Sequence, residues 1–432
     1  MKHNYSPKSS HHIHDNRIRQ MFNSIELENI KAFRDPTKID LAPITILLGK
    51  NNSGKSAIAR LPIVITRSLG SHGGPPLVLQ DSDIDYAESI TDLAYFRSPS
   101  PIRWKATIGS LSIETTIIED TSNQNQVIQK LTIQKENIRT TWELIERPDK
   151  SGRALYKISD IPEPLRTAFV SGLPEPEGLP EPIRGLLIEV KQVFRAIKSG
   201  HLYIGPIRVE PQRIYRNTPW QGSGIDARGE HIPNLLSLSS STQNSSDIDQ
   251  LAGNWFEQNL GQRIEVMREG RGTYFSLVTK DSQGRAPINL VDTGQGFGQV
   301  LPIIVGLKAA QAEPRTPRSL IVLEQPELHL HPAAHKDVAD AILELHKISP
   351  NQRIIIETHS ENLLLRFRRR VADGSLDAGN LLAYWIEPTA QGSVPRKIIF
   401  DQTGAPSDWP TGVFAEDYEE VLAIREALKR KR

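Results

Sequence analysis

The sequence predicts an α/β fold in which a mixed or parallel sheet core is flanked by helices. Apolar runs with the length of a buried strand occur at 44–48, 319–323 and 353–357, and each leads into glycine-rich or polar residues. Helix-compatible segments follow these runs, so strand and helix alternate near both ends of the chain. Such alternation is typical of a parallel sheet whose functional residues gather at the carboxyl ends of the strands.

The composition excludes several classes of protein. The 432 residues allow two or three domains. The 52 Lys and Arg nearly balance the 51 Asp and Glu, so no net charge attracts the chain to nucleic acid or to a membrane surface. The absence of cysteine excludes disulfides and thiolate metal sites and fits a reducing cytoplasm. No apolar run approaches the roughly 18–20 residues of a membrane span, and residues 1–20 lack an apolar signal-peptide core. We expect a cytoplasmic protein without a membrane partner.

The segment Gly49–Ser56 carries the most specific motif. It reads GKNNSGKS and fits G-x-x-x-x-G-K-[ST] at every fixed position, between an apolar strand and the start of a helix. The backbone N–H groups of such a loop surround phosphate oxygens, its Lys reaches the β- and γ-phosphates, and its Ser hydroxyl ligates Mg²⁺. We therefore expect ATP and Mg²⁺ to bind to Gly49, Asn51, Asn52, Ser53, Gly54, Lys55 and Ser56.

The segments beside this loop predict a sheet edge and a further lobe. Two short strands are expected near 25–30 and 39–41, and Phe33 or Arg34 between them either touches adenine or ribose or packs on the edge. Antiparallel strands are expected at 104–108, 111–118 and 127–134, a stiff Pro-Glu linker at 173–182, and helices near 186–197 and 247–260. No heptad series predicts a long coiled coil. Three loop arginines either contact a nucleotide, a partner or DNA or form internal ion pairs; they are Arg208, Arg213 and Arg216.

Two later strand ends supply two of the three further groups that ATP hydrolysis needs. The three are a carboxylate near Mg²⁺, a base for the attacking water and a group that senses the γ-phosphate. Glu324 ends one apolar run and suits the Mg²⁺ role, and His359 follows the next run and is placed like a γ-phosphate sensor.

These residues carry a resemblance to a known family. The phosphate loop, LIVLEQPELHLHP at 320–332 and ETHS at 357–360 resemble ABC-type ATPases, which include SMC proteins, RecF and the overcoming-lysogenization-defect (OLD) proteins. The E-x-P-E-x-H-L-H-P string and T-H-S are characteristic of the OLD-like branch, which is often assigned to the AAA family. GQGFGQVLP at 294–302 resembles its signature motif, and WPTGVF at 409–414 is similar to the tail of one bacterial subgroup of small ATPases.

The resemblance implies a P-loop NTPase fold of the ABC-ATPase type. A disordered extension would cover 1–20, the two parts of the ATPase head would cover 21–100 and 286–432, and an inserted β-rich and helical lobe would cover 101–285. In this family two heads sandwich ATP, so Gly296, Gly298 and Gln299 would approach the γ-phosphate of the opposite subunit. Gln80 or a neighbour is a candidate for the lid glutamine of the family.

The chain departs from the family's pattern at the catalytic pair and the signature serine. The usual Asp-Glu is Glu324-Gln325 here, and an amide cannot accept a proton from water. Gly298 replaces the serine. Either Glu327 supplies the base, or hydrolysis is slow and ATP acts mainly as a clamp. We favour slow hydrolysis, because Glu324, Glu327 and His359 remain.

Three function hypotheses follow. The first is an ATP-dependent switch that forms a homodimer or larger homo-oligomer and acts on a separate effector, a nuclease or toxin, as in prokaryotic antiphage defence. The roughly 70 residues after Ser360 are too few for the nuclease domain of OLD proteins, and the acidic residues outside the ATP site are scattered. The alternatives are a RecF-like ATPase that grips DNA with the arginines at 366 and 368–370, and a non-hydrolysing ATP-dependent scaffold.

Three histidines near Glu327 do not predict a zinc site. His329, His331 and His335 have no cysteine beside them and no evident fourth ligand. We expect them to shape the loop that faces the opposite subunit.

Overall fold

The computed structural model describes residues 21–120, 125–159, 161–218, 224–241, 248–281, 283, 285–312, 320–409 and 423–424. The disordered extension expected at 1–20 lies outside these ranges, as do residues 410–414 of the tail motif. The sequence also predicts a charged helix at 416–432, and nearly all of that segment lies outside the described ranges. Among the described residues, no helix combines the length and the apolar character that crossing a membrane requires.

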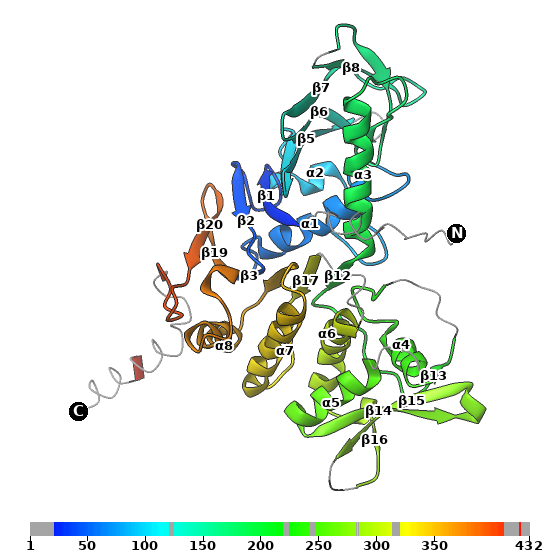
Figure 1. The fold of residues 1–432 in the computed structure, drawn as a ribbon, viewed down its shortest axis with the longest axis vertical. Coiled ribbons are helices and arrows are strands. Elements are labelled where there is room, and N and C mark those ends of the chain that lie inside the picture. Colours follow the sequence, from blue (N-terminus) through cyan, green and yellow to red (C-terminus); the bar gives the residue numbers. More distant parts are fainter. Residues whose placement is uncertain are drawn as a thin grey trace, which may run out of the picture.

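A six-stranded sheet forms the centre of the molecule (Figure 1). Its order is β12-β17-β18-β3-β19-β20, with the first five strands parallel and the last antiparallel. The strands are β12 His201–Ile204, β17 Leu320–Glu324, β18 Arg353–Glu357, β3 Ile44–Gly49, β19 Leu381–Thr389 and β20 Gly392–Ile399. Because β3, β17 and β18 run in the same direction, their carboxyl ends meet at one edge, as the sequence predicts.

Alternate side chains of these apolar strands enter two different cores. Leu47, Val322 and Ile355 face one core, together with helices α1 Lys55–Leu69 and α3 Ile183–Ser199. Their neighbours along the strands, such as Ile46 and Ile354, face a second core with α5 Ile248–Leu260, α6 Gln295–Ala312, α7 His335–Ile348 and α8 Glu361–Ala372. A sheet that is buried on both faces requires the continuous apolar runs that the sequence contains.

An eight-stranded sheet covers the α1 side and extends into the upper part of Figure 1. Its order is β2-β1-β4-β5-β6-β7-β8-β9, and every pairing in it is antiparallel. The bounds are β1 Phe22–Glu28, β2 Thr37–Asp40, β4 Ile102–Ile108, β5 Leu111–Asp120, β6 Asn125–Lys135, β7 Ile138–Glu146, β8 Ala154–Ile158 and β9 Leu165–Thr167. Helix α3 packs on it through the apolar stripe expected near 186–197.

Smaller elements complete the fold. A second antiparallel sheet lies beside α5 and α6 in the lower part of Figure 1, and it contains β13 Tyr215–Arg216, β15 Tyr274–Asp281, β14 Gln262–Glu269 and β16 Ile288–Asn289. The remaining elements include α2 Ile90–Leu93, α4 Ile232–Ser239, and the paired strands β10 Phe169–Val170 and β11 Leu173–Pro174. The longest helix in the described ranges is α6 with 18 residues, which agrees with the absence of a heptad series.

The sheets cross the expected limits of the inserted lobe. β1 pairs directly with β4, so the eight-stranded sheet continues across residue 100, and β12, within 101–285, pairs with β17 of the central sheet. The Pro-Glu segment expected as a linker contributes the buried side chains of Leu173 and Leu179 to the first core. Hydrogen bonding and packing therefore join the lobe to the ATPase core at several points.

The central strand β18 should dominate stability. Ile355 has no exposed surface, whereas Ile399, at the end of β20 in the same sheet, is 51% exposed. We expect Ile355→Ala to lower the free energy of unfolding by about 2–5 kcal/mol, because it leaves a cavity in a closed core. Ile399→Ala is the matched control and should cost much less. Denaturant unfolding followed by circular dichroism measures both, and equal losses would contradict the assignment of β18 to the core.

Candidate nucleotide-binding site

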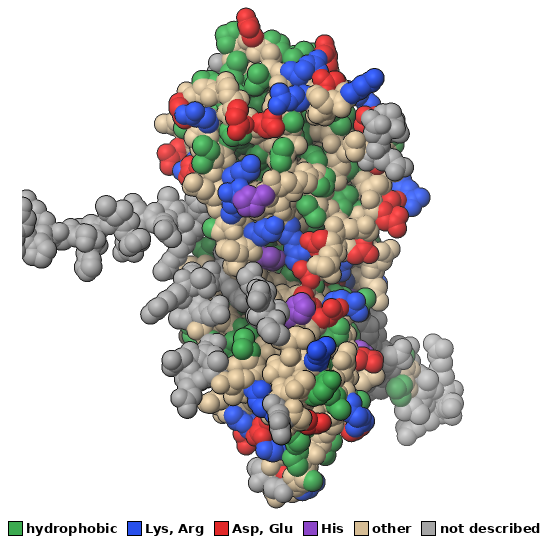
Figure 2. Space-filling model, turned by 90° about the vertical axis from the view of Figure 1, so that its right-hand side faces the viewer, with side chains coloured by type: hydrophobic (Ala, Val, Ile, Leu, Met, Phe, Trp, Pro, Cys, Tyr) green, Lys and Arg blue, Asp and Glu red, His purple; other side chains and the backbone are tan. Residues whose placement is uncertain are grey.

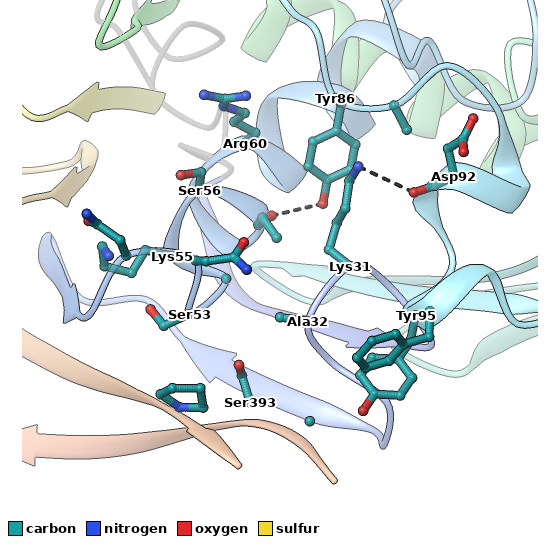
Figure 3. A pocket seen from close by; sticks show the side chains of 18 of the residues that line it. Lys31, Ala32, Ser53, Lys55, Ser56, Arg60, Tyr86, Asp92, Tyr95 and Ser393 are labelled. Carbon is teal, nitrogen blue, oxygen red and sulfur yellow. Dashed lines mark hydrogen bonds between the residues drawn. The ribbon is translucent and has the colours of Figure 1, made fainter. Parts of the chain in front are cut away.

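A cavity of about 1050 Å³ opens at the carboxyl edge of the central sheet (Figure 3). The phosphate loop forms one wall, and Gln325, Glu357 and His359 line the cavity from the ends of β17 and β18. The turn after β1, the segment 85–97 and the β19–β20 hairpin close the opposite side. The structure thus brings the phosphate loop and His359, for which the sequence predicts a sensor role, to the same cavity.

Gly54 shapes the phosphate loop. Its φ of +97° lies in the left-handed region, and a Cβ there would come within 2.8 Å of the ring of Phe33. Only glycine allows this approach without strain. The ring of Phe33 is fully buried against the loop, so of the two interpretations of Phe33 the structure supports packing rather than contact with adenine. Arg34 instead donates a hydrogen bond to Gln391, at 2.6 Å.

The Lys55 ammonium folds over the phosphate loop. It donates to the carbonyl oxygens of Gly49 and Lys50, at 2.9 and 2.8 Å. Burial lowers the pKa of Lys55, an effect that the charge of Glu357 partly offsets. Among the described residues, the hydrogen bonds of this buried ammonium go to neutral carbonyls, so phosphate oxygens would be stronger partners for it.

The Ser56 hydroxyl donates to Oε1 of Glu357, at 3.0 Å. Within the described part of the chain, Oε2 of Glu357 is buried without a hydrogen-bond partner. Burial, together with the nearby charge of Glu324, raises the pKa of Glu357 to about 7. A hydroxyl and a carboxylate beside the phosphate loop are oxygen donors of the kind that Mg²⁺ takes when it also binds phosphates, so the residues present fit this ion.

Glu324 is held by a different set of partners. Arg60 of α1 donates two hydrogen bonds to its carboxylate, both at 2.7 Å, and the Tyr203 hydroxyl donates a third, at 2.9 Å. Burial by itself would lower the pKa of Arg60. The hydrogen bonds and the charge of Glu324 have the larger combined effect, so the pKa of Arg60 is raised. Burial, and then the charge of Glu324, raise the pKa of Tyr203, which keeps its proton. Glu324 lies beside the cavity but is not among the described residues that line it.

Glu327 supports the sensor segment. Its Oε1 accepts from the Thr358 hydroxyl at 2.6 Å and from the His359 backbone N–H at 2.9 Å. These contacts fix the backbone from which the His359 side chain reaches the cavity. Partial burial, and then the charge of Lys55, lower the pKa of His359, so the imidazole is neutral near pH 7.

Arg208 connects the end of β17 to α6. Its buried guanidinium donates to the carbonyls of Glu324 and Gln325, both at 2.8 Å, and to those of Gly205 and Gln299, both at 3.1 Å. Burial lowers the pKa of Arg208 to about 10, so it remains charged. The sequence left open whether Arg208 contacts a ligand or forms bonds within the chain, and the structure shows bonds within the chain. Arg213 likewise pairs with Asp292.

The signature segment lies outside the cavity wall. Gly296, Gly298 and Gln299 are on the first two turns of α6, and none of them is among the described lining residues. A Cβ on Gly298 would come within 2.5 Å of Pro211, and one on Gly296 within 2.9 Å of the His329 carbonyl oxygen. Gly296 therefore lets α6 approach the loop after β17, and Gly298 lets it approach the loop after β12. Gly294 has open space around it.

His329, His331, His335 and Gln80 are not among the described residues of the cavity wall. No group of three His, Cys, Asp or Glu among the described residues could hold a metal ion. His335 instead lies 2.7 Å from the Ser360 hydroxyl and 3.2 Å from the Leu330 carbonyl oxygen. Gln80 donates to Asp85, which does line the cavity.

Aromatic residues form the far end of the cavity. Tyr95 and Phe96 line it and contact each other edge to face, with ring centroids 4.6 Å apart. Phe96 is 86% exposed and has a φ of +47°, followed by +55° at Arg97. Bulky residues rarely adopt this conformation, which tends to occur at functional sites.

A P-loop site at the edge of an α/β core is typical of nucleotide-binding proteins of the ATPase class. Residues 21–136 match the family model "AAA ATPase domain", and residues 171–366 match the model "AAA domain, putative AbiEii toxin, Type IV TA system". Both models describe AAA ATPase domains, and together with the observed fold they support an ATPase of this class. No curated protein matches the sequence.

Solved structures of SMC heads are similar over most of the chain. An SMC head bound to the C-terminal winged-helix domain of ScpA has 13% identity and a TM-score of 0.43, over 88% of this chain and 98% of that one. The SMC head domain from Thermotoga maritima has 12% identity and a TM-score of 0.36, over 87% and 98%. The SMC head from Pyrococcus furiosus, bound to the C-terminal domain of ScpA, has 11% identity and a TM-score of 0.41, over 95% and 100%.

Several residues of the site were not predicted from the sequence. Glu357 precedes a motif that drew attention to His359, and its position at a strand end was the only available signal. Arg60 and Tyr203 carry no motif, since their partner Glu324 is 264 and 121 residues away. The pair Tyr95-Phe96 could have been noticed as adjacent aromatic residues in a polar segment.

The exposed ring of Phe96 should stack on the base of a bound nucleotide. We expect Phe96→Ala to weaken ATP binding about ten-fold, because stacking on an aromatic side chain contributes roughly 1–3 kcal/mol per base. Affinity for inorganic triphosphate should not change. Tyr274→Ala, which removes a 46% exposed aromatic ring from β15, is the control. Calorimetric titration measures each affinity, and an equal loss for triphosphate would exclude a contact with the base.

Proposed function

We propose that this ATPase is a switch that binds ATP·Mg²⁺, closes as a homodimer around the nucleotide, hydrolyses it slowly and acts on a separate effector protein. Lys55 would neutralise the phosphates, Mg²⁺ would supply charge compensation to the β- and γ-phosphates when bound, and His359 would sense the γ-phosphate. Glu324 and Glu327 remain the proposed acidic residues of the hydrolytic machinery. Gln325 lines the cavity but offers no carboxylate.

One observation carries the dimer proposal. The phosphate loop and His359 share one cavity, whereas the first turn of α6 does not contribute to its described wall. Gly294 and Gln295 are exposed at the start of this helix, where N–H groups favour a negatively charged ligand. A second copy would bring such a helix terminus to the open side of the cavity. A larger homo-oligomer is compatible with the same contact.

Antiphage defence is the proposed setting. The family model matched by residues 171–366 is described as a putative AbiEii toxin of a type IV toxin–antitoxin system, which supports a defence or toxin–antitoxin setting. That the effector, a nuclease or toxin, is a separate chain is part of our proposal. The acidic residues Asp81 and Asp83 both pair with Arg67, so they do not form a metal-binding nuclease centre.

DNA binding receives less support. Arg366 and Arg370 both bind Asp340, and Arg368 donates to the Gly404 carbonyl oxygen, so three of the four clustered arginines already have internal partners. On the face in Figure 2, basic and acidic side chains are interspersed. This face lacks the continuous basic stripe that phosphate backbones select; α8, which carries the clustered arginines, lies on the opposite side of the molecule.

Turnover should respond in opposite directions to two isosteric exchanges. We expect Gln325→Glu to raise the rate at least ten-fold, since a positioned general base contributes about 10²–10⁴-fold. Glu327→Gln should lower the rate, although its amide oxygen can still accept from Thr358 and His359. Glu361→Gln, an exposed exchange in the first turn of α8, is the control. Phosphate release measures all three, and an unchanged rate in Glu327→Gln would remove Glu327 as a candidate base.

Dimerisation should require both bound nucleotide and an unobstructed N-terminus of α6. With saturating ATP at micromolar concentration, the wild type should double its mass in light scattering. Lys55→Ala should stay monomeric because it loses the nucleotide. Gly294→Arg should bind ATP yet stay monomeric, because Gly294 has open space within the chain but would clash with a second copy. A wild type that remains monomeric with ATP would contradict the switch proposal.

A further inference from the structure

Two buried carboxylates lie next to each other at the cavity edge. Glu324 and Glu357 are direct partners in the register of β17 and β18, and they are 1% and 4% exposed. Like charges at this spacing oppose each other, and burial adds to the cost of keeping both ionised. Each therefore needs a compensating positive group or a proton.

Only Glu324 has a complete set of donors. Arg60 binds both of its oxygens, and Tyr203 adds a further bond to Oε1. The remaining hydrogen bond of Arg60 goes to the Asp85 carbonyl oxygen, at 3.1 Å, so this guanidinium is committed. A cation would have to displace Arg60 before it could bind Glu324.

Glu357 has the opposite arrangement. Its Oε1 accepts only from Ser56, and its Oε2 has no hydrogen-bond partner among the described residues although it is buried. Glu357 lines the cavity, and Glu324 does not. The free oxygen is therefore close to the place where the phosphates of a nucleotide would lie.

The separation of the oxygen atoms also suits a divalent cation. Two cis ligands of an octahedral Mg²⁺, each at about 2.1 Å, are about 3.0 Å apart, and the Ser56 and Glu357 oxygens are 3.0 Å apart. Mg²⁺ commonly takes one or two carboxylates together with phosphate oxygens and water. A serine hydroxyl and one carboxylate are thus a sufficient protein contribution.

We propose that Glu357, rather than Glu324, is the carboxylate that holds the nucleotide-bound divalent cation together with Ser56, while Glu324 positions Arg60 and Tyr203. This inference rests on the proposed binding of ATP·Mg²⁺. It changes the role expected from the sequence, in which Glu324 was the Mg²⁺ ligand, and it gives a function to the glutamate that precedes the sensor motif.

Electron paramagnetic resonance of Mn²⁺ tests the assignment without relying on turnover. Full-length protein is titrated with Mn²⁺ in the presence of a non-hydrolysable ATP analogue, and free Mn²⁺ is read from its six-line signal. We expect Glu357→Gln to weaken the nucleotide-dependent Mn²⁺ site at least ten-fold, since loss of a ligand should cost no less than the roughly 10–100-fold known for outer-shell partners. Glu324→Gln should change it less than three-fold. Glu357→Asp, which keeps the charge, should recover part of the loss.

Controls separate this inference from the proposed function. Binding of a fluorescent ATP analogue in EDTA should be unchanged in Glu357→Gln, and its circular dichroism should match the wild type. A loss in Glu324→Gln equal to or larger than that in Glu357→Gln would overturn the assignment. So would unchanged Mn²⁺ affinity in Glu357→Gln. A wild type without any nucleotide-dependent Mn²⁺ site would instead refute ATP·Mg²⁺ binding itself.

Discussion

The position of β18 between β3 and β17 is the constraint on which the site depends. The strand pairs in parallel with both neighbours, and the register aligns Glu357 with Glu324 on one side and with Leu47 on the other. The phosphate loop, the Glu324-Gln325 turn and the sensor segment consequently begin at the same level of the sheet. A one-residue slip of β18 would turn Glu357 to the other face and bury Ile356 against α1.

This register also creates the electrostatic problem that Arg60 solves. Two carboxylates at paired positions would disfavour folding unless a cation lies between or beside them. Arg60, one turn beyond the phosphate loop on α1, reaches Glu324 with the bidentate geometry that a guanidinium allows. Removing one partner of such a buried pair typically costs about 3–5 kcal/mol. The pairing leaves Glu357 as the carboxylate that is still available to the cavity.

The sequence predicted those parts of the structure that local pattern determines. The phosphate loop, the three buried strands and the apolar stripe of α3 are encoded within short windows, and each was observed. The partners of polar side chains were not predictable, because they join residues far apart in the chain: Ser56 and Glu357 are 301 positions apart, and Arg208 and Glu324 are 116 apart. Phe33 shows the same limit, since only the close approach of Gly54 decides that its ring is buried.

Arg208 connects two segments on which the proposed switch depends, the turn after β17 and the start of α6. Its guanidinium binds backbone carbonyls on the turn after β17 and on the second turn of α6, so the signature helix cannot shift relative to Gln325 without losing charge-assisted hydrogen bonds in a buried site. Gln325, held at a φ of +47° and bonded through its N–H to the Glu357 carbonyl oxygen at 2.7 Å, ties the same turn to β18. A change at the γ-phosphate that moved Gln325 would therefore reach α6 through Arg208, and α6 is the helix that the dimer proposal presents to the second subunit.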